Sequence, residues 1–408
     1  MGEILFLVHR IPWPPDRGDK IRSHWILRKL AALAPVHVGC FADDARDEGF
    51  ANDMAGLCAS MHVERRGKSM WGAGLEALAS GAPVSLTSFA SGTMRRWVEN
   101  TLNRGSIDRV VVFSGQMAQY VPTDCDARFI MDFVDVDSAK FESYGKHGTG
   151  PMSWINRREG RLLAQFEAHV AGRANASLFV SEAEAALFRE RSELDAGRVL
   201  ALGNGIDAAY YDPARADITP MPVRREGPLL VFTGQMDYRP NVEAVSDFAR
   251  HVLPRVQSWH GDVTFAIVGR NPADEVHRLG ELPGVIVTGA VNDVRCWLQA
   301  ADVVVAPLRI ARGIQNKVLE AMAMARPVVA SSAAAEGIDA RDGTHFCVAG
   351  DAAGEAERIL ALLADPARAA AMGQAARAHV AAHYDWDSQL ALLDDLLGDP
   401  ACIVEAAE

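Results

Sequence analysis

The sequence predicts an α/β protein built from two doubly wound, Rossmann-like parallel sheets. Short, near-continuous apolar runs rich in β-branched residues recur along the chain, and such runs are typical of strands buried on both faces of a parallel sheet. Helical stretches alternate with these runs in both halves. Between the halves, residues 208–228 hold four prolines and several charges but few apolar runs, which indicates a domain boundary.

The apolar runs give each half its own series of strands. In the first half we expect strands at 4–8, 36–41, 109–113, 129–134, 177–180 and 199–202, with a helix-rich stretch over 44–104. In the second half we expect them at 229–232, 263–268, 285–288, 302–306 and 328–330. The predicted organisation is a first domain over 1–205, a linker over 206–228, a second domain over 229–382 and a C-terminal helix over 383–408, for which packing on the first domain is one option.

Composition excludes several classes of protein. A net charge of −12 argues against a general nucleic-acid binder. The six cysteines are scattered without metal-ligand spacing, which favours reduced thiols in a cytoplasmic protein. No signal peptide is expected, and no stretch approaches the roughly 20 apolar residues of a membrane span. A peripheral contact with the inner face of a membrane stays compatible with this composition.

The stretch from Ala301 to Gly337 is the first candidate site, because it indicates a strand, a basic glycine turn, a helix and a strand. A helix start offers unpaired N–H groups, and Gly313 would let a ligand approach the backbone closely. Arg309, Arg312 and Lys317 would add positive charge for a nucleotide diphosphate. Glu320 lies about 10 Å along the helix axis at roughly 1.5 Å per residue, a suitable place for a ribose. The alternative is a βαβ unit with a solvated basic loop and a surface glutamate.

The loop after the first strand is the second candidate. It contains Asp16, Arg17, Gly18, Asp19 and Lys20, and it delivers the chain to a helix expected over 21–33. Ligands of open α/β sheets bind at the carboxyl ends of the strands, so this loop is placed for binding. A rigid surface loop held by salt bridges is the alternative.

A third candidate follows the strand expected at 129–134, where three carboxylates occur within six residues. Asp137 and Ser138 are well placed to cap the next helix. Asp135 is therefore the predicted functional carboxylate of this segment.

These motifs together resemble the family 4 glycosyltransferases of the GT-B fold, over nearly the full length of the chain. The residues that carry the resemblance are PPDRGDKIRS, VSEAE, GNGID, TGQMDYRPNVEAV and APLRIARGIQNKVLEAMAMARPVVAS. The opening loop and the last of these segments are most similar to the sugar transferases associated with exosortase (PEP-CTERM) and exopolysaccharide gene clusters. The resemblance implies two Rossmann-like domains that face an interdomain cleft.

The resemblance also implies a reaction: retaining transfer of a sugar from a nucleotide-diphosphate donor to a saccharide or lipid-linked saccharide acceptor, without metal or cofactor. Glu320 matches the second glutamate of the family's E-x7-E motif, which holds the donor ribose. Gly18 matches the glycine loop near the donor phosphate and the acceptor. Asp135 lies near the position of a histidine that helps to position the donor sugar in many members.

Two departures from the family pattern bear on this prediction. The first glutamate of the E-x7-E motif falls on Arg312, and the family's Arg and Lys after the linker fall on Gln235 and Pro240. Other basic residues would then neutralise the diphosphate. We expect replacement of Arg312 or of Lys317 by alanine to weaken donor binding by about 1–3 kcal/mol.

The predicted site residues fall into three groups. The catalytic candidates are Asp135, Arg312 and Lys317. The donor-binding candidates are Gly18, Gly234, Arg239, Arg309, Gly313, Ile314, Gln315 and Glu320, and the acceptor-side candidates are Asp16, Arg17, Asp19 and Lys20. Two alternatives stay open: a nucleotide-sugar epimerase, and an inactive GT-B scaffold of a polysaccharide assembly complex.

Overall fold

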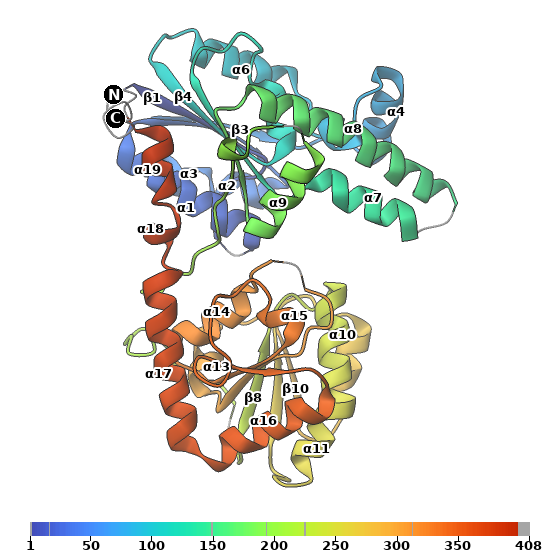
Figure 1. The fold of residues 1–408 in the computed structure, drawn as a ribbon, viewed down its shortest axis with the longest axis vertical. Coiled ribbons are helices and arrows are strands. Elements are labelled where there is room, and N and C mark those ends of the chain that lie inside the picture. The colour runs from blue at the N-terminus through green and yellow to red at the C-terminus, as the bar shows by residue number, and fades with distance from the viewer. Residues whose placement is uncertain are drawn as a thin grey trace. The chain divides into compact units, whose positions relative to one another are not determined.

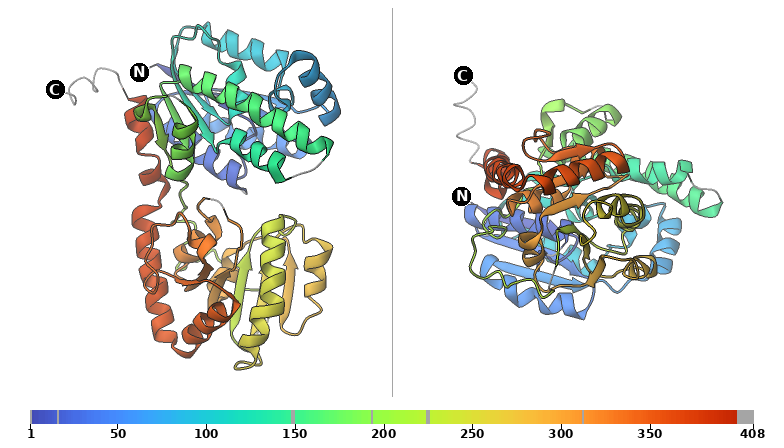
Figure 2. Two further views of the ribbon diagram at one scale, coloured as in Figure 1. Left: turned by 45° about the vertical axis from the view of Figure 1, so that its right-hand side comes forward. Right: turned by 90° about the horizontal axis from the view of Figure 1, so that it is seen from below.

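The computed structural model describes residues 2–15, 17–147, 150–192, 194–223, 226–311 and 313–398, apart from the side chains of His147 and Ala196. The chain forms two compact units (Figures 1 and 2). The first contains residues 1–203 and the C-terminal segment from Leu390, and the second contains residues 204–389. Each unit has one parallel sheet, which confirms the predicted α/β class with two Rossmann-like sheets.

The sheet of the first unit has seven strands in the order β3-β2-β1-β4-β5-β6-β7, and all neighbours are parallel. Strand β3 was not predicted, because its sequence is half polar and its side chains are only partly buried. The strands are β1 (Glu3–Val8), β2 (Val36–Ala42), β3 (Ser60–Arg65), β4 (Ile107–Phe113), β5 (Arg128–Val134), β6 (Ala176–Phe179) and β7 (Val199–Ala201).

Helices and short 3-10 turns connect these strands, and helices pack on both faces of the sheet (Figure 1). Lys29 pairs with Asp394 at 2.6 Å, and Arg109 donates to the Leu397 carbonyl at 3.1 Å, so the last helix belongs to the first unit. The helices are α1 (Gly18–Leu33), α2 (Ala45–Gly49), α3 (Ala51–Met54), α4 (Met70–Ser80), α5 (Val84–Thr87), α6 (Gly92–Leu102), α7 (Asp137–His147), α8 (Pro151–Arg173), α9 (Glu182–Arg191) and α19 (Leu392–Leu397). The 3-10 turns are η1 (Ala55–Leu57), η2 (Gly115–Tyr120) and η3 (Ala196–Arg198).

The sheet of the second unit has six parallel strands in the order β10-β9-β8-β11-β12-β13. Five of them match the predicted strands, and the sixth, β13, is only three residues long, too short to be recognised as an apolar run. The strands are β8 (Leu229–Thr233), β9 (Thr264–Val268), β10 (Val285–Gly289), β11 (Val303–Ala306), β12 (Val328–Ser331) and β13 (Cys347–Ala349).

One helix of the second unit differs from the sequence prediction. The sequence predicts one continuous helix over 242–259, but this helix is interrupted by a π-helical turn, η4 (Phe248–Val252), because Pro254 has no N–H to continue the hydrogen-bond ladder. The helices are α10 (Arg239–Asp247), α11 (Leu253–Gln257), α12 (Asp274–Leu279), α13 (Arg295–Ala300), α14 (Asn316–Ala323), α15 (Ser332–Ala335), α16 (Ala352–Ala364), α17 (Pro366–His383) and α18 (Trp386–Gln389). None of the helices in the described ranges is long and apolar enough to cross a membrane.

The strand order of each sheet selects one place for a binding site. In the first unit, β1 lies between β2 and β4, so the chain winds in opposite directions from this point, and β8 has the same position between β9 and β11. Loops that leave the carboxyl ends of the strands at such a switch point are where open α/β sheets bind ligands. The loops after β1, β4, β8 and β11 are therefore the ones that the fold positions for function.

Candidate functional site

The loop after β8 is closely packed at the carboxyl edge of the second unit's sheet. The Gly234 amide donates to the Val268 carbonyl at 3.0 Å. A Cβ on Gly269 would lie 1.6 Å from the Gly234 carbonyl oxygen, and one on Gly234 would lie 2.8 Å from Asn241 Nδ2 and 3.3 Å from Lys317 Nζ. Gly234 is thus enclosed by its neighbours, and a side chain there would displace Asn241 or Lys317.

Lys317 lies in the first turn of α14 and reaches back to this loop. Its ammonium donates to Asn241 Oδ1 at 2.6 Å and lies 4.2 Å from the ring centroid of Phe232. Burial lowers the pKa of the Lys317 ammonium to about 7, although the charge of Glu320 acts in the opposite direction. A dianion bound beside it would favour the charged form, so this lysine is suited to a phosphate-like ligand.

The start of α14 could bind a ligand through its first backbone amides, which the N-cap side chain does not cap. Gln315, at the N-cap position, provides no side-chain capping hydrogen bond to the first turn. Gly313 has a φ of 63°, in the region that glycine adopts readily, and a Cβ on Gly337 would contact Gly313 and Ile314 at 3.7–3.8 Å. The first amides of α14 and Lys317 therefore present positive potential from one short segment. Arg312, the predicted neighbour in this turn, lies outside the described residues.

Glu320 follows Lys317 by one turn of α14 and is partly buried. Burial raises the pKa of its carboxyl group, whereas a hydrogen bond with Tyr211 and the charge of Lys317 lower it. Tyr211 comes from the segment that the sequence analysis assigned to a linker, and no local pattern marks it as a partner of Glu320. The carboxylate has further lone pairs, which could accept hydrogen bonds from two ligand hydroxyl groups.

Two of the predicted arginines of the second unit, Arg239 and Arg309, have surface carboxylate partners. Arg239, at the start of α10, pairs with Glu243 at 2.7 Å, and its side chain is almost fully exposed. Arg309, after β11, pairs with Asp247, which also accepts from His251. The structure thus brings Gly234, Lys317 and Glu320 together and gives Arg239 and Arg309 other partners; the donor-binding roles of these arginines stay predictions.

The loop after β1 is a network of ion pairs. Arg10 contacts Asp19 at 2.8 Å and Asp43 at 2.9 Å, and Arg17 contacts the same two carboxylates at 3.3 and 3.2 Å. Lys20 contacts Asp47 at 2.8 Å. This network agrees with the alternative interpretation of the loop, a rigid surface loop held by salt bridges.

Two further features of this loop concern the predicted residues. Burial would raise the pKa of Asp19, but hydrogen bonds from His9 and Arg10 hold it well below its usual range, so this carboxylate stays charged. A Cβ on Gly18, the first residue of α1, would have no atom of the described residues within 4 Å. Asp16 lies outside the described residues.

The ends of β4 and β5 are strained next to Asp135. Ser114 has a φ of 76° and Val134 a φ of 72°, and such a φ is rare for a β-branched residue. Asp135 follows directly and is exposed, whereas Val134 is held by a hydrogen bond from its amide to Asp132 at 3.1 Å. The strain therefore fixes the direction in which an exposed carboxylate leaves the sheet.

His9 joins this edge and was not predicted. It follows β1 directly, its ring stacks on Phe113 at 5.7 Å, and its Nε2 lies 3.3 Å from Asp19. Burial lowers the pKa of His9, and Asp19 raises it. Its place at the carboxyl end of the first strand was the only sequence signal that could have indicated it.

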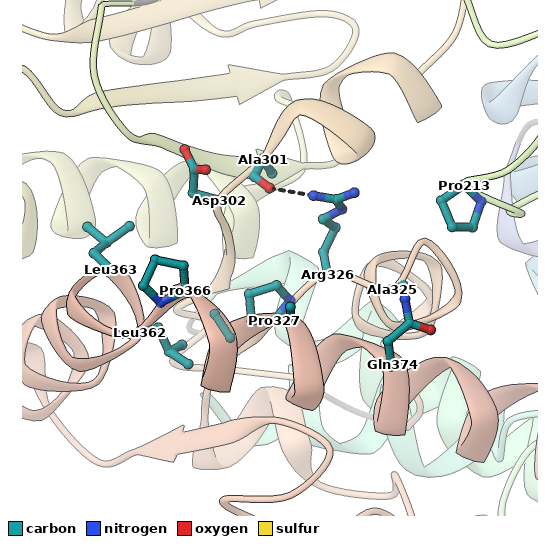
Figure 3. A pocket seen from close by; sticks show the side chains of 12 residues that line it. Pro213, Ala301, Asp302, Ala325, Arg326, Pro327, Leu362, Leu363, Pro366 and Gln374 are labelled. Atoms are coloured by element: carbon teal, nitrogen blue, oxygen red, sulfur yellow. Dashed lines mark hydrogen bonds between the residues drawn. The ribbon is translucent and has the colours of Figure 1, made fainter.

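A separate hollow of 310 Å³ lies in the second unit (Figure 3). Ala301 and Asp302 line it before β11, and Arg326 and Pro327 line it before β12, with Arg326 donating to the Ala301 carbonyl at 3.3 Å. These residues precede their strands, whereas Gly234 and Lys317 lie at the carboxyl ends. The hollow is therefore at the opposite edge of the sheet from the candidate site. In the described ranges, no group of three or more His, Cys, Asp or Glu residues is arranged to hold a metal ion.

Comparison with known proteins shows that the second unit is similar to glycosyltransferases. Residues 227–365, which contain Gly234, Lys317 and Glu320, match the family described as glycosyl transferases group 1. A lipopolysaccharide core biosynthesis mannosyltransferase, LpcC of Rhizobium leguminosarum bv. viciae, is 29% identical over 217 residues, which are 48% of this chain and 59% of that protein. The chain thus spans less than two thirds of the length of this curated relative.

Solved structures resemble the whole chain in fold. HepE of Anabaena, crystallised with UDP and glucose, is 15% identical with a TM-score of 0.64 over 98% of this chain and 100% of that one. Sucrose-phosphate synthase of Thermosynechococcus elongatus is 16% identical with a TM-score of 0.68 over 100% of both chains. The fold is therefore GT-B, with two Rossmann-like parallel-sheet domains.

Proposed function

We propose that this protein is a glycosyltransferase that moves a sugar from a nucleotide-diphosphate donor to a saccharide or lipid-linked saccharide acceptor. The observation that carries the proposal is the position of Lys317 over Gly234, with Glu320 one turn further along α14, inside the segment that matches the group 1 glycosyltransferases. We further propose that the transfer retains the anomeric configuration, needs no metal, and serves exopolysaccharide or other cell-surface glycan synthesis in the cytoplasm.

The proposed donor site assigns one task to each group. The diphosphate would lie over Gly234 and accept hydrogen bonds from Lys317 and the first amides of α14. Glu320 would accept hydrogen bonds from the ribose hydroxyls, with Tyr211 fixing the direction of its carboxylate. Arg312, which directly precedes Gly313 in the sequence, would add charge to the diphosphate.

The proposed reaction balances without a protein nucleophile. The bond between the sugar's anomeric carbon and the diphosphate oxygen breaks while the acceptor hydroxyl oxygen bonds to that carbon. The hydroxyl proton passes to the departing diphosphate, whose negative charge Lys317 and the helix start stabilise. In the first unit, the loop around Gly18 would bind the acceptor, and Asp135 would orient the reacting sugar.

A thermal-unfolding screen with UDP-, GDP-, ADP- and dTDP-sugars tests the donor site. A ligand that binds the folded state raises the melting temperature, so we expect one nucleotide class to do so. Lys317→Met and Glu320→Gln should reduce the rise strongly, whereas Glu275→Gln, a matched change at the exposed Arg250–Glu275 ion pair of the same unit, should preserve it. A rise that both site variants retain would contradict the assignment.

Product analysis then tests the reaction. Transfer predicts a new glycoside only when an acceptor hydroxyl is present. A changed sugar formed from donor alone would indicate an epimerase instead, and donor binding with an intact donor across a broad acceptor panel would indicate a scaffold.

A further inference from the structure

Helix α4 of the first unit has the reverse of the usual amphipathic pattern. Ala73 and Ala77 are its fully buried residues, whereas Trp71, Leu75 and Leu78 are 87%, 69% and 61% exposed. The spacing of these three residues, i, i+4 and i+7, places them on one side of the helix. A surface helix normally buries its large apolar side chains and exposes its small or polar ones. The outer side of α4 is therefore suited to an apolar partner outside the unit.

The exposed apolar surface continues onto the start of α8. Met152, Trp154 and Ile155 are all exposed there. Arg158, one turn after Trp154 on the same side of α8, donates to the Ala77 carbonyl of α4 at 2.8 Å. The hydrogen bond fixes the beginning of α8 beside the end of α4, and Figure 1 shows α4 beside α8. We call this surface the α4–α8 face, formed by Trp71, Leu75, Leu78, Met152, Trp154 and Ile155.

The α4–α8 face is held in place by buried polar contacts. The Glu159 carboxylate accepts hydrogen bonds from the amides of Val84 and Ser85, each at 2.8 Å, just beyond α4. The Thr87 hydroxyl donates to the Ala73 carbonyl at 2.9 Å. The large side chains are therefore exposed in an anchored helix rather than at a loose end of the chain.

The charges at the start of α8 are mostly positive, and the one charged residue of α4, Glu76, is paired with Lys68 at 2.6 Å. Residues 151–161 contain three arginines and one acidic residue, Glu159, which is buried. Arg157 and Arg161 are exposed. The chain as a whole has a net charge of −12, so this local excess of positive charge contrasts with the rest of the molecule. Exposed tryptophans, leucines and arginines together match the boundary of a bilayer that contains anionic lipid.

We propose that the α4–α8 face docks on a phospholipid surface that contains anionic lipid. Trp71 and Trp154 would lie at the level of the headgroups, Leu75 and Leu78 at the acyl boundary, and the arginines at the lipid phosphates. A second copy of the chain fits less well, because a two-fold interface would bring the arginines of one copy toward those of the other. The surface belongs to the first unit, and its binding requires neither a donor nor sugar transfer.

Flotation of the full chain with vesicles tests the proposal. We expect binding to vesicles of phosphatidylethanolamine and phosphatidylglycerol, weaker binding to phosphatidylcholine, and release by salt. The double variant Trp71→Ser/Leu75→Ser should bind at least about tenfold more weakly. Trp259→Ser is the matched control, because Trp259 is 79% exposed in the second unit and outside this face. Arg157→Gln/Arg161→Gln should reduce the preference for the anionic vesicles.

Melting curves of each variant show that it is folded, which is expected because Ala73 and Ala77 are unchanged. Wild-type protein that binds neither kind of vesicle would overturn the proposal, as would equal binding by Trp71→Ser/Leu75→Ser. A wild-type dimer that this double variant makes monomeric, seen by light scattering, would assign the face to a second copy instead. The vesicle result stands or falls independently of whether any nucleotide sugar binds.

Discussion

At the residue scale, the candidate site depends on a lysine that is partly neutral when the site is empty. Lys317 donates to an amide oxygen and contacts an aromatic ring, and its pKa is lowered to about 7. The charge of Glu320 acts in the opposite direction and raises the pKa of Lys317. A diphosphate would bind the protonated form and raise this pKa, so ligand binding and proton uptake are linked.

Donor affinity should therefore fall as the pH rises above about 7. The empty site loses its proton there, and binding must then take one up, so the dissociation constant should rise by up to about tenfold per pH unit. Calorimetry at pH 6.5, 7.5 and 8.5 measures this directly, in buffers of different ionisation enthalpy to count protons. Lys317→Met should bind more weakly with little change over this range. A wild-type affinity that is equally independent of pH would refute the linkage.

Gly234 and Gly18 are both predicted to bind the donor, but their surroundings differ, so the same substitution at the two positions makes a matched comparison. Gly234→Ala places a methyl group 2.8 Å from Asn241 and 3.3 Å from Lys317, whereas the methyl group of Gly18→Ala has no atom of the described residues within 4 Å. Overpacking of this kind costs about 1–3 kcal/mol, so the first variant should lower the free energy of unfolding and weaken donor binding. Gly18→Ala should leave stability nearly unchanged. Chemical denaturation of both variants decides, and equal stabilities would show that the Gly234 loop relaxes freely.

At the scale of elements, periodicity predicted what the core determines. The buried strands β1, β4, β8 and β11 are continuous apolar runs, so they and the loops that follow them were found from the sequence alone. The half-polar strand β3 and the three-residue β13 carry no such pattern. The side of α4 that faces solvent could not be predicted either. Its apolar residues indicate a helix, but they do not indicate that the large apolar side chains are the exposed ones.

The partners within the site were the least predictable part. Lys317 and Glu320 were predicted as site residues from one segment, but Asn241 and Tyr211 contact them from positions about 76 and 109 residues away in sequence. The ring of His9 stacks on Phe113 because β1 pairs with β4. Such contacts depend on strand order, which a local pattern does not specify.

Arg158 should stabilise the first unit by linking α8 to α4. Its guanidinium donates to the carbonyls of Ala77 in α4 and of Ala82 just beyond the helix. Hydrogen bonds from a charged donor contribute about 1.5–3 kcal/mol, so Arg158→Ala should lower the free energy of unfolding by about that amount. Arg161→Ala, an exposed change one turn away, should stay within about 0.5 kcal/mol of wild type. Equal effects of the two variants in urea denaturation would show that α4 does not depend on this contact.

At the scale of the whole molecule, the chain returns from the second unit to the first at Leu390. The helix α19 buries Leu393 and Leu397 in the first unit, and Arg109 and Lys29 hold it by polar contacts. Two compact units with their own cores are expected to unfold in separate or partly coupled steps. Removal of the segment after Gln389 should therefore lower the stability of the first unit more than that of the second unit.

Truncation after Gln389 tests this connection. The shortened chain loses Leu390, Leu393 and Leu397, each about 1% exposed, and leaves their apolar contacts open to water. At about 1.5–3 kcal/mol for each buried leucine, the first unit should lose several kcal/mol of stability, and its unfolding transition should move to lower temperature. The rise in melting temperature that a donor gives the second unit should persist, because Lys317 and Glu320 are unchanged. A chain that ends at Gly398 is the control for length. If calorimetry shows both transitions unchanged after truncation at Gln389, α19 contributes little to the first unit; if the donor effect disappears as well, the two units do not respond independently.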